Sequence, residues 1–347
     1  MIEDFPGEIN SLEKKDKFGV GIVGCGLIGQ KRAKALGEQG KLIACADIDI
    51  HRAQNLAHQY QNVKSFVNWQ ELILLPEIDI VIIATLHDSL AEITLNAIKA
   101  GKHVLVEKPA ARNPNELESV LEAAKKFNKK VHVGFNHRYH RALLKAKEIV
   151  DEGLLGELMF VRARYGHGAR VGYDKEWRAN PELSGGGELI DQGPHLIDLS
   201  RWFLGDFSDI NGFAHTYFWD MPVDDNGFMI LKTIDNKVAF LHASCTEWKN
   251  LFSMEIYGKL GKLDISGLGG SYGVERLTYY KMLPKMGPPE TMSWEYPMAD
   301  NSWDVEMEEF YADISLDRNP QANLNDAFQA LKIIQKIYKD SGYDNCA

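Results

Sequence analysis

The chain has 347 residues, a length that suggests two domains with a cleft between them rather than one core. With 45% hydrophobic and 25% charged residues, its composition is that of a soluble globular protein and not of a disordered one. The formal net charge is -10 and the sequence contains no block of Lys or Arg. This argues against a nucleic-acid partner, because phosphate binding needs a concentrated cationic surface.

Residues 1–17 form a tail with charges of both signs and no apolar run. We therefore expect neither a signal peptide nor a membrane anchor, and a cytoplasmic protein without a membrane partner. The four cysteines lack C-x-x-C spacing, so we predict incidental buried thiols rather than a disulfide framework or a zinc ribbon. They are Cys25, Cys45, Cys245 and Cys346.

A glycine motif follows the first predicted strand. The apolar run 18–23 predicts the strand, and residues 30–39 predict the helix after the motif. Gly24 would allow a tight turn, Gly26 would let a pyrophosphate approach backbone N–H groups, and Gly29 would let helix and strand pack closely. The motif therefore predicts a dinucleotide site, with Leu27 and Ile28 at the start of the helix beside the cofactor.

The second predicted strand, 42–48, carries an acidic residue at its end. Asp47 lies 23 residues after Gly24, the spacing at which a carboxylate accepts the ribose hydroxyl protons of an adenosine. A carboxylate there would repel a 2′-phosphate, so we expect NAD rather than NADP. Arg52 leaves NADP open, or is a solvated residue of the next helix. Asp49 is expected in a turn or a helix cap.

Helices and strands alternate through the rest of the first domain. Parallel strands separated by helices predict a doubly wound sheet with right-handed crossovers over residues 18–137. In such sheets ligands bind at the carboxyl edge, so Lys108, just after a strand in Glu107-Lys108-Pro109, is predicted to point into the cleft. The predicted helices are 51–60, 69–75, 90–100 and one opening at 113–114, and the predicted strands are 63–66, 78–85, 103–107 and 131–135.

The chain resembles the Gfo/Idh/MocA oxidoreductases, a family that includes inositol, glucose-fructose and nucleotide-sugar dehydrogenases. The most specific part of the resemblance is the Glu-Lys-Pro motif followed by a glycine run and Asp-x-x-x-His, and the whole spans roughly residues 19–340. The matching stretches are GIVGCGLIG, AGKHVLVEKP, GFNHRYHRA, GGGELIDQGPHLIDLSRWFLG, IYGKLGKL and EMEEFYADI.

The resemblance implies an α/β protein in which a Rossmann domain is followed by an α/β domain with a large, mostly antiparallel open sheet. Residues 138–341 would form this second domain, which binds substrate and oligomerises. The nicotinamide would lie between Lys108 and the Asp191/His195 helix, and the Lys108–Pro109 bond can be cis. Glu107, Thr85 and His87 would contact the cofactor. Thr85 and His87 lie in a stretch where the family often has Thr-Pro-Asn, so this chain departs from the family pattern at these two cofactor contacts.

An acid and an imidazole stand four residues apart in the apolar run after the glycines 185–187. On one helix, Asp191 and His195 project to the same side. We predict that His195 takes the proton of an alcohol in oxidation and returns it in reduction, while Lys108 stabilises alkoxide charge. Asp191 would orient the imidazole or hold a neighbouring hydroxyl.

Alternatives remain at this site. Lys108 can itself carry the proton, and an isolated Asp/His pair can be purely structural. We predict no metal, because no further ligands have suitable spacing. The glycines before the predicted helix favour close approach of the backbone to a ligand, or else a flexible turn.

The stretch from 165 to 187 has no clear period and predicts a long loop that leads to the catalytic helix. Aromatic side chains pack on the C–H faces of sugar rings, and an arginine can meet a phosphate or carboxylate. Ordinary packing or surface roles are the alternative for each. The candidate substrate residues are Tyr165, Tyr173, Trp177 and Arg178 in this stretch, with Asn136 and His137 after the strand 131–135.

The last part of the chain predicts antiparallel strands at 226–234, 237–245 and 252–258, followed by an amphipathic helix at about 323–341. One face of such a sheet must be buried elsewhere, so we expect subunits to pair as a homodimer or homotetramer. The sequence thus predicts an NAD-dependent dehydrogenase for a sugar, cyclitol or other polyol. The alternatives are a non-catalytic NAD(P)-binding regulator and a sugar oxidoreductase or hydrolase that retains NADP.

Overall fold

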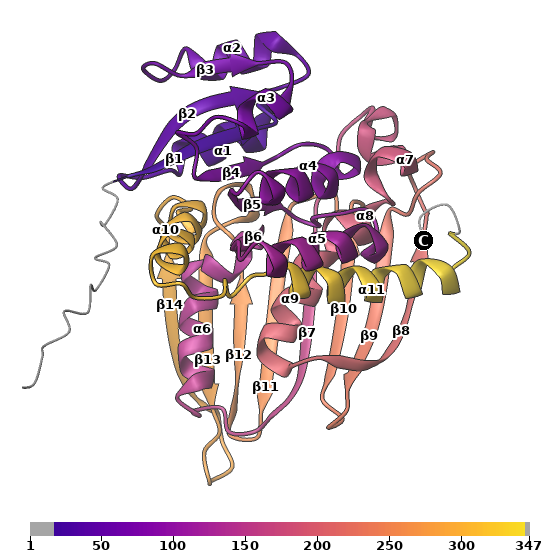
Figure 1. Cartoon of the computed structure of the whole chain (residues 1–347). Coiled ribbons are helices and arrows are strands. Elements are labelled where there is room, and N and C mark those ends of the chain that lie inside the picture. The colour runs from indigo at the N-terminus through magenta and orange to yellow at the C-terminus, as the bar shows by residue number, and fades with distance from the viewer. Residues whose placement is uncertain (1–16, 344–347) are drawn as a thin grey trace, which may run out of the picture.

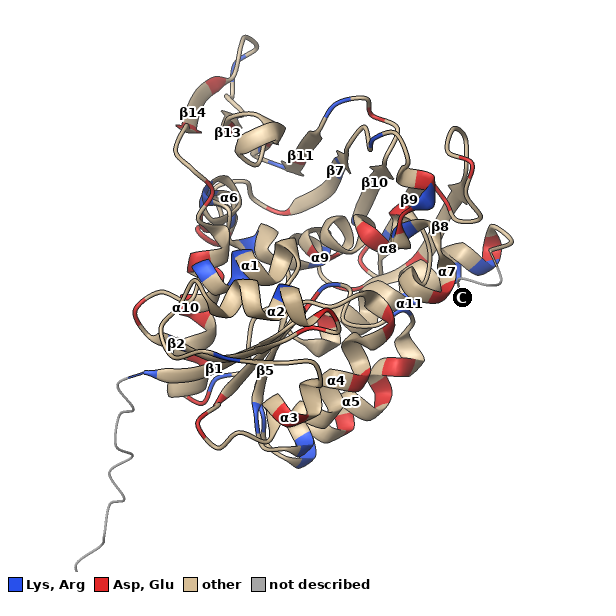
Figure 2. Ribbon diagram, turned by 90° about the horizontal axis from the view of Figure 1, so that it is seen from above, with Lys and Arg blue, Asp and Glu red and all other residues tan. Residues whose placement is uncertain are grey.

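The computed structural model describes residues 17–343, which form two sheets with helices packed around them (Figure 1). The tail 1–16 and residues 344–347, with Cys346, lie outside the described residues. The predicted α/β class is confirmed: a parallel sheet of six strands is followed by a mostly antiparallel sheet of eight. Charged residues of both signs are interspersed over the ribbon of both domains (Figure 2).

The first domain is a parallel sheet with the order β3-β2-β1-β4-β5-β6. The order reverses between β1 and β4, the place where dinucleotides bind in such folds. Val20 and Ile22 of β1 belong to a core cluster that includes residues of α1 and α2, whereas Val23 belongs to the other core cluster, which includes residues of α4 and α5. The strands are β1 Phe18–Val23, β2 Gly40–Ala46, β3 Lys64–Phe66, β4 Ile80–Ile83, β5 His103–Glu107 and β6 Val131–Gly134, and the helices are α1 Leu27–Lys34, α2 Ile50–Ala57, α3 Trp69–Ile73, α4 His87–Lys99 and α5 Pro114–Lys126.

The second sheet has the order β14-β13-β12-β11-β7-β10-β9-β8 and is antiparallel except where β7 meets β10. The sequence predicted β9, β10 and β11 but no strand at β7, β8, β12, β13 or β14. Several of these carry charged residues on their solvent side, which obscures the apolar alternation. The strands are β7 Leu158–Gly166, β8 Phe207–His215, β9 Asn226–Thr233, β10 Val238–Ser244, β11 Leu251–Gly258, β12 Gly261–Ser266, β13 Glu275–Lys281 and β14 Glu290–Tyr296.

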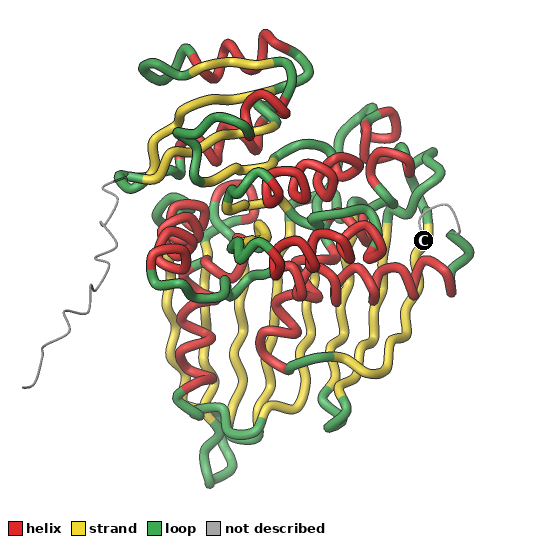
Figure 3. Tube along the Cα trace, in the orientation of Figure 1, coloured by secondary structure: helices red, strands yellow, loops and turns green. Residues whose placement is uncertain are grey.

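Helices cover one face of the second sheet (Figure 3). α6 packs against β12, β13 and β14, α9 against β7 and β10, and α11 against β8. Short helices in the loop after β7 and before β13 surround the cleft described below. The remaining helices are α6 Arg141–Asp151, α7 Pro181–Ser184, α8 Glu188–Asp191, α9 Gly193–Leu204, α10 Ser302–Ser315 and α11 Leu324–Asp340, and the 3-10 turns are η1 Asn136–Tyr139, η2 Tyr173–Lys175, η3 Trp177–Ala179 and η4 Gly270–Tyr272.

The C-terminal segment returns to the first domain. Phe310 and Tyr311 of α10 join the core formed by β1, α1 and α2, on one face of the parallel sheet. α11 packs against α5 and β6 on one side and against α9 and β8 on the other. It begins at Asn323, whose side chain caps it. Residues from the predicted second domain therefore complete the core of the first, and the final helix lies between the two sheets.

Candidate active site

Three glycines in the loop after β1 have three separate physical roles. Gly24 has φ +91°, and its N–H donates to Ala46 O at 2.9 Å. A Cβ on Gly29 would lie 1.9 Å from Gly24 O, so helix and strand touch there. A Cβ on Gly26 would meet no atom within 4 Å. The backbone at Gly26, at the N-terminus of α1, is thus the one of the three left open for a ligand to approach.

The acidic residue after β2 lies beside this loop. Asp47 Oδ2 accepts from Cys25 N at 2.8 Å, and Oδ1 accepts from Asp49 N at 2.9 Å. These bonds fix the carboxylate at the edge of the dinucleotide loop. Asp49 caps α2 through His51 N, as expected. Arg52 is exposed and its Nε lies 3.6 Å from Asp49 Oδ2, so in this structure it is a solvated residue of α2.

A cleft of about 560 Å³ runs from the dinucleotide loop to the second sheet. Leu27 and Ile28 line one end, and Lys108, Asp191 and His195 line the other. The predicted catalytic residues are therefore brought together, although their positions in the sequence span 87 residues from 108 to 195. Thr85, His87 and Glu107 also lie on the wall of this cleft.

Asp191 is held between two cations. Lys108 Nζ donates to Asp191 Oδ1 at 2.7 Å and to its backbone O at 2.6 Å, while Arg178 Nε donates to Oδ2 at 2.8 Å. Burial alone would raise the pKa of Asp191, but Lys108 and Arg178 together hold it well below its usual value. Arg178, predicted to meet an anionic group of the substrate, lines the cleft and pairs there with this carboxylate through its Nε.

His195 is not oriented by Asp191, contrary to one prediction from the sequence. Both carboxylate oxygens of Asp191 bind cations, and His195 Nδ1 is buried without a hydrogen-bond partner among the described residues. The His195 ring instead stacks on His137, with centroids 3.8 Å apart and planes at 25°. Burial, followed by the nearby Lys108, lowers the pKa of His195 well below its usual value. The imidazole is therefore a neutral acceptor.

The single helix predicted to carry Asp191 and His195 is split in two. Asp191 ends α8 and His195 lies in α9, with Gln192 between the segments. Pro194 is the physical reason: it has no N–H to donate to Ile190 O, and its ring crowds that carbonyl. Both side chains still line the same cleft, but their relation is not that of two residues stacked on one continuous helix.

The glycine run before α8 packs closely on the protein itself. A Cβ on Gly186 would lie 2.3 Å from the Tyr338 hydroxyl, and one on Gly187 would lie 1.9 Å from Asp224 O. Asp224 accepts from Gly187 N at 3.0 Å, Leu189 N at 2.7 Å and the Tyr338 hydroxyl at 2.7 Å. Burial raises the pKa of Asp224 to about 6 even though these hydrogen bonds lower it. Neither interpretation of the glycines from the sequence included this contact.

His87 and Thr85 lie at the start of α4. His87 Nδ1 lies 2.8 Å from Ser184 O, so the ring links the first domain to the loop after β7. Its ring also meets the edge of Trp177 with centroids 4.9 Å apart. Burial lowers the pKa of His87 to about 4, so it is neutral. Thr85 accepts a hydrogen bond from Ser89 Oγ at 2.9 Å.

Glu107, predicted as a cofactor contact, belongs to a buried ion-pair network. Its Oε1 lies 2.6 Å from Arg32, which also pairs with Glu306 of α10. Glu306 in turn lies 3.2 Å from His132 Nε2. The guanidinium carbon of Arg32 lies over the ring of Trp303, 4.3 Å from the ring centroid. The network ties α1, β5, β6 and α10 together directly behind Lys108.

The structure separates the predicted substrate residues into two groups. Asn136, His137, Tyr165 and Arg178 line the cleft. Tyr173 is buried away from it against Trp219, with ring centroids 5.7 Å apart. The guanidinium carbon of Arg178 lies over the ring of Trp177, 4.5 Å from the ring centroid. Trp177 itself does not line the cleft. Hydrophobic burial of Tyr173 and the pairing of Trp177 with a neighbour are contacts that the sequence does not reveal.

Other cleft residues were not predicted. The segment 268–272 between β12 and β13 forms one wall, and its tip includes glycines with positive φ. Tyr272 meets Tyr165 there, with ring centroids 5.5 Å apart. Glu188 of α8 lies beneath Asp191, and burial, followed by Asp191 and Asp224, raises its pKa well above the usual value. The only sequence signal for the wall was the glycine-rich run 267–273.

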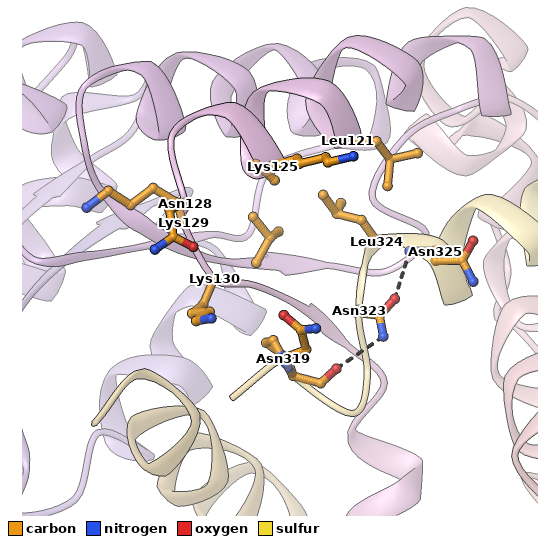
Figure 4. A pocket seen from close by; sticks show the side chains of 12 residues that line it. Leu121, Lys125, Asn128, Lys129, Lys130, Asn319, Asn323, Leu324 and Asn325 are labelled. Carbon is orange, nitrogen blue, oxygen red and sulfur yellow. Dashed lines mark hydrogen bonds between the residues drawn. The ribbon is translucent and has the colours of Figure 1, made fainter. Parts of the chain in front are cut away.

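A second cavity, of about 380 Å³, lies on another part of the molecule (Figure 4). It is lined by the end of α5, including Lys125, and by residues before and at the start of α11, including Asn323. None of its lining residues lines the cleft described above.

Within residues 17–343 there is no group of three or more His, Cys, Asp or Glu side chains that could hold a metal ion. Helices in this range are too short or too polar to cross a membrane. Cys25, Cys45 and Cys245 are buried free thiols, as predicted.

Comparison with known proteins gives matches in both domains. Residues 18–135 match the family model described as an oxidoreductase family with an NAD-binding Rossmann fold, and residues 143–264 match the GFO/IDH/MocA C-terminal domain. The chain is 31% identical over 229 residues to levoglucosan dehydrogenase of Pseudarthrobacter phenanthrenivorans, an alignment covering 62% of this chain and 58% of that protein. It is 34% identical to D-glucoside 3-dehydrogenase of Escherichia coli, covering 48% and 47%, and 29% identical to inositol 2-dehydrogenase of Gluconacetobacter diazotrophicus, covering 54% of each.

The alignments thus span about half of the length of these curated relatives. Among solved structures, levoglucosan dehydrogenase in complex with NADH and levoglucosan superposes with a TM-score of 0.85 at 23% identity, covering 94% of this chain and 98% of that one. The aldose-aldose oxidoreductase from Caulobacter crescentus, complexed with glycerol, gives 0.81 at 24% identity with the same coverage. At these identities the likeness establishes the fold.

Proposed function

The chain belongs to the Gfo/Idh/MocA family of oxidoreductases and carries its NAD-binding Rossmann domain, and from this premise we propose that it is an NAD-dependent dehydrogenase for a secondary alcohol of a sugar, cyclitol or related polyol. The observation that carries the proposal is the meeting of Lys108, Asp191 and His195 at one end of a cleft whose other end is the dinucleotide loop.

The residues present fit a dinucleotide. The open backbone at Gly26 and the N–H groups at the start of α1 suit a pyrophosphate, and the fixed carboxylate of Asp47 suits the ribose hydroxyls. Leu27 and Ile28 give the site an apolar edge. When bound, the nicotinamide ring supplies the redox chemistry, taking up or giving the hydride of the carbinol carbon. A carboxylate at Asp47 and a solvent-facing Arg52 favour NAD over NADP.

Lys108 would bind the reacting oxygen. Its ammonium has three donors, and Asp191 accepts two of them through Oδ1 and the backbone O. The third is free to donate to the substrate hydroxyl and to stabilise negative charge that develops on that oxygen. Asp191, held by Arg178, keeps the ammonium in place.

His195 would accept the alcohol proton. Burial keeps its pKa low and hence its ring neutral, so one ring nitrogen has a lone pair at physiological pH. An imidazole positioned at the hydroxyl contributes roughly 100-fold to 10,000-fold in rate. Lys108 remains the alternative proton carrier, and the pH dependence of the two corresponding variants distinguishes them.

The polyol would lie between the catalytic pair and the second sheet. Tyr165 and Tyr272 offer aromatic faces to the C–H side of a ring, and Asn136 offers polar atoms at the same wall. The three curated relatives named above are dehydrogenases of levoglucosan, a glucoside and inositol, all polyhydroxylated rings. We extend that substrate class to this chain.

The test is reduction of NAD and of NADP by the purified protein with a panel of inositols, free sugars, levoglucosan, glucosides, sugar phosphates and nucleotide sugars. Turnover with a polyol and NAD supports the proposal. Silence across the panel with NADH binding intact would favour a non-catalytic regulator, and silence in both directions with the matching keto-sugars would reject the dehydrogenase.

His195→Ala provides the residue-level control for the same assay. We expect turnover to fall at least roughly 100-fold, while the Kd for NADH stays unchanged, because the imidazole lies at the substrate end of the cleft. Lys108→Ala should lose activity similarly. Full activity of the His195 variant would remove it as the base.

We also propose that the open face of the second sheet joins subunits into a homodimer or homotetramer. Phe213, Ile230 and Phe240 are exposed on the face opposite the covering helices. Phe240 lies opposite Ile230 in register, so they form one apolar area. Apolar surface of this kind on a sheet favours burial against a second copy. Introducing charge there with Phe240→Glu should shift the molecular mass in light scattering to the monomer, and an unchanged mass would reject this face as the interface.

A further inference from the structure

A histidine that acts as a base is usually oriented by a hydrogen bond to its second ring nitrogen, often from a carboxylate or a backbone carbonyl. His195 lacks this device. Its Nδ1 is buried and has no hydrogen-bond partner among residues 17–343. The nearby carboxylate of Asp191 is occupied by Lys108 and Arg178. Something else must therefore hold the ring.

The other ring against His195 is His137. Their centroids are 3.8 Å apart and their planes meet at 25°, which is a face-to-face stack. His137 is 5% exposed, and it comes from η1, directly after β6 and remote in sequence from α9. The edge of Tyr165, with centroids 4.8 Å apart, and that of Phe252, with centroids 5.8 Å apart, hold the His137 ring in turn. The stack is therefore supported from the second sheet.

We propose that His137 is a positioning residue for His195, in place of the usual carboxylate: its neutral ring fixes the plane of the base and offers a π face to the imidazolium that forms when the alcohol proton is taken. The inference rests on the proposed role of His195 as the base. A π face within about 6 Å attracts a cation, and this attraction grows where water is excluded. The His137 ring satisfies both conditions.

The surroundings keep His137 neutral. Burial lowers its pKa well below the usual value, followed by the effects of His195, His140 and Lys108. The charged and titratable groups around the pair are Lys108 and Asp191 beside His195, Tyr165 at its edge, and His140 beside His137, with Glu275 and Asp300 next to His140. Two stacked imidazoles would repel one another if both were charged. The pair can therefore hold only one proton beyond those of the two neutral rings, and we assign that proton to His195, on which Lys108 acts most strongly after burial.

The matched variants are His137→Phe, which keeps a flat π face without ring nitrogens, and His137→Ala, which removes the face. We expect the Phe variant to keep kcat within about threefold and the Ala variant to lose at least about tenfold, with the Kd for NADH unchanged in both. Equal losses in the two variants would show that a nitrogen of His137 takes part in chemistry, and no loss in either would remove the stack from the mechanism. Each of these results overturns the proposal.

The pH dependence separates positioning from a general structural effect. Burial is the largest cause that lowers the pKa of His195, so the variant that tests the π face must not admit water. His137→Leu fills the volume without a π face, and because the imidazolium then loses that attraction, the pKa of His195 should fall further below its usual value. The acidic limb of kcat/KM should then move to lower pH in the Leu variant and stay in place in the Phe variant. A limb that stays in place in both contradicts the proposal.

An NMR titration of the labelled His195 ring in the same proteins makes the result independent of turnover. A pKa of His195 that falls in the Leu variant but not in the Phe variant supports the stack even if no polyol is oxidised, in which case only the proposed function fails. If the Ala variant does not fold, His137→Leu fills the volume without a π face and is expected to lose kcat as the Ala variant would. A Leu variant with wild-type kcat would overturn the proposal.

Discussion

The two ends of the cleft are built by different means. At the nucleotide end, the proposed pyrophosphate contacts come from the backbone of one continuous stretch, Gly24 to Gly29. At the catalytic end, side chains from β5, η1, the loop after β7, α8 and α9 meet, and charges balance across them. A site built from the backbone of one loop therefore depends on the shape of that loop. A site assembled from side chains of several elements depends instead on the ion pairs between those side chains.

The largest expected effect is a loss of stability caused by a substitution in the glycine loop at the nucleotide end. In Gly29→Ala the new Cβ would lie 1.9 Å from a backbone oxygen, so we expect the free energy of unfolding to fall by about 3 kcal/mol. Gly26→Ala meets nothing within 4 Å and should leave that free energy unchanged while weakening NADH binding. Denaturant unfolding and NADH titration of the two variants provide the measurement. Equal stabilities would refute the assignment of packing to Gly29 and approach to Gly26.

The second prediction concerns the pH dependence of stability that the buried carboxyl group of Asp224 causes at the catalytic end. Asp224, which caps α8, has its pKa raised from the usual value to about 6 by burial. Because the folded state holds this proton more tightly than the unfolded state, the Asp224 contribution lowers stability as pH rises from about 4 to about 6. A rise of this size corresponds to about 3 kcal/mol. Compared with Asp224→Asn, the wild type should lose that much over the window, measured by chemical denaturation at each pH. Parallel curves for the two proteins would contradict the assignment.

A smaller effect tests the charge balance at Asp191. Arg178→Ala removes one of the two cations on this carboxylate, which leaves it free to move away from Lys108, so kcat should fall roughly 20-fold. The matched control is Arg170→Ala in the same loop, because Arg170 is exposed and pairs with Glu176. We expect the control to retain its activity. A loss of the same size in both would indicate a general effect of the loop.

The smallest effect sharpens the cofactor assignment. Asp47→Ala removes the carboxylate at the ribose position, so the Kd for NADH should rise about tenfold and that for NADPH should rise less. Fluorescence titration of both nucleotides measures the difference. Equal weakening would mean that Asp47 acts only through its hydrogen bonds to Cys25 and Asp49.

Much of the first domain could be predicted because its signals are local. The helices and strands from Phe18 to Gly134 follow the alternation of apolar runs and caps, and the Asn113-Pro114 start of α5 is a local cap. Only three of the eight strands of the second sheet were predicted, since strands such as β8 and β12 carry charged residues on their open face and gain their stability from neighbours. The break between α8 and α9 was missed although Pro194 signals it, because the Asp191/His195 spacing favoured one helix.

The sequence by itself determined the dinucleotide loop, the parallel sheet and the place of Lys108, because these follow from a local motif and from the edge at which parallel strands end. That Asp191 and His195 face the same cleft was implied only by the family resemblance. Only the tertiary structure decided which partners those side chains have. Asp191 binds Arg178 rather than His195, His195 stacks on His137, Glu107 pairs with Arg32, and the glycine run packs on Asp224 and Tyr338. Each pair joins residues far apart in the chain, and buried charges and rings take the partner that lies nearest in space, which spacing along the sequence does not encode.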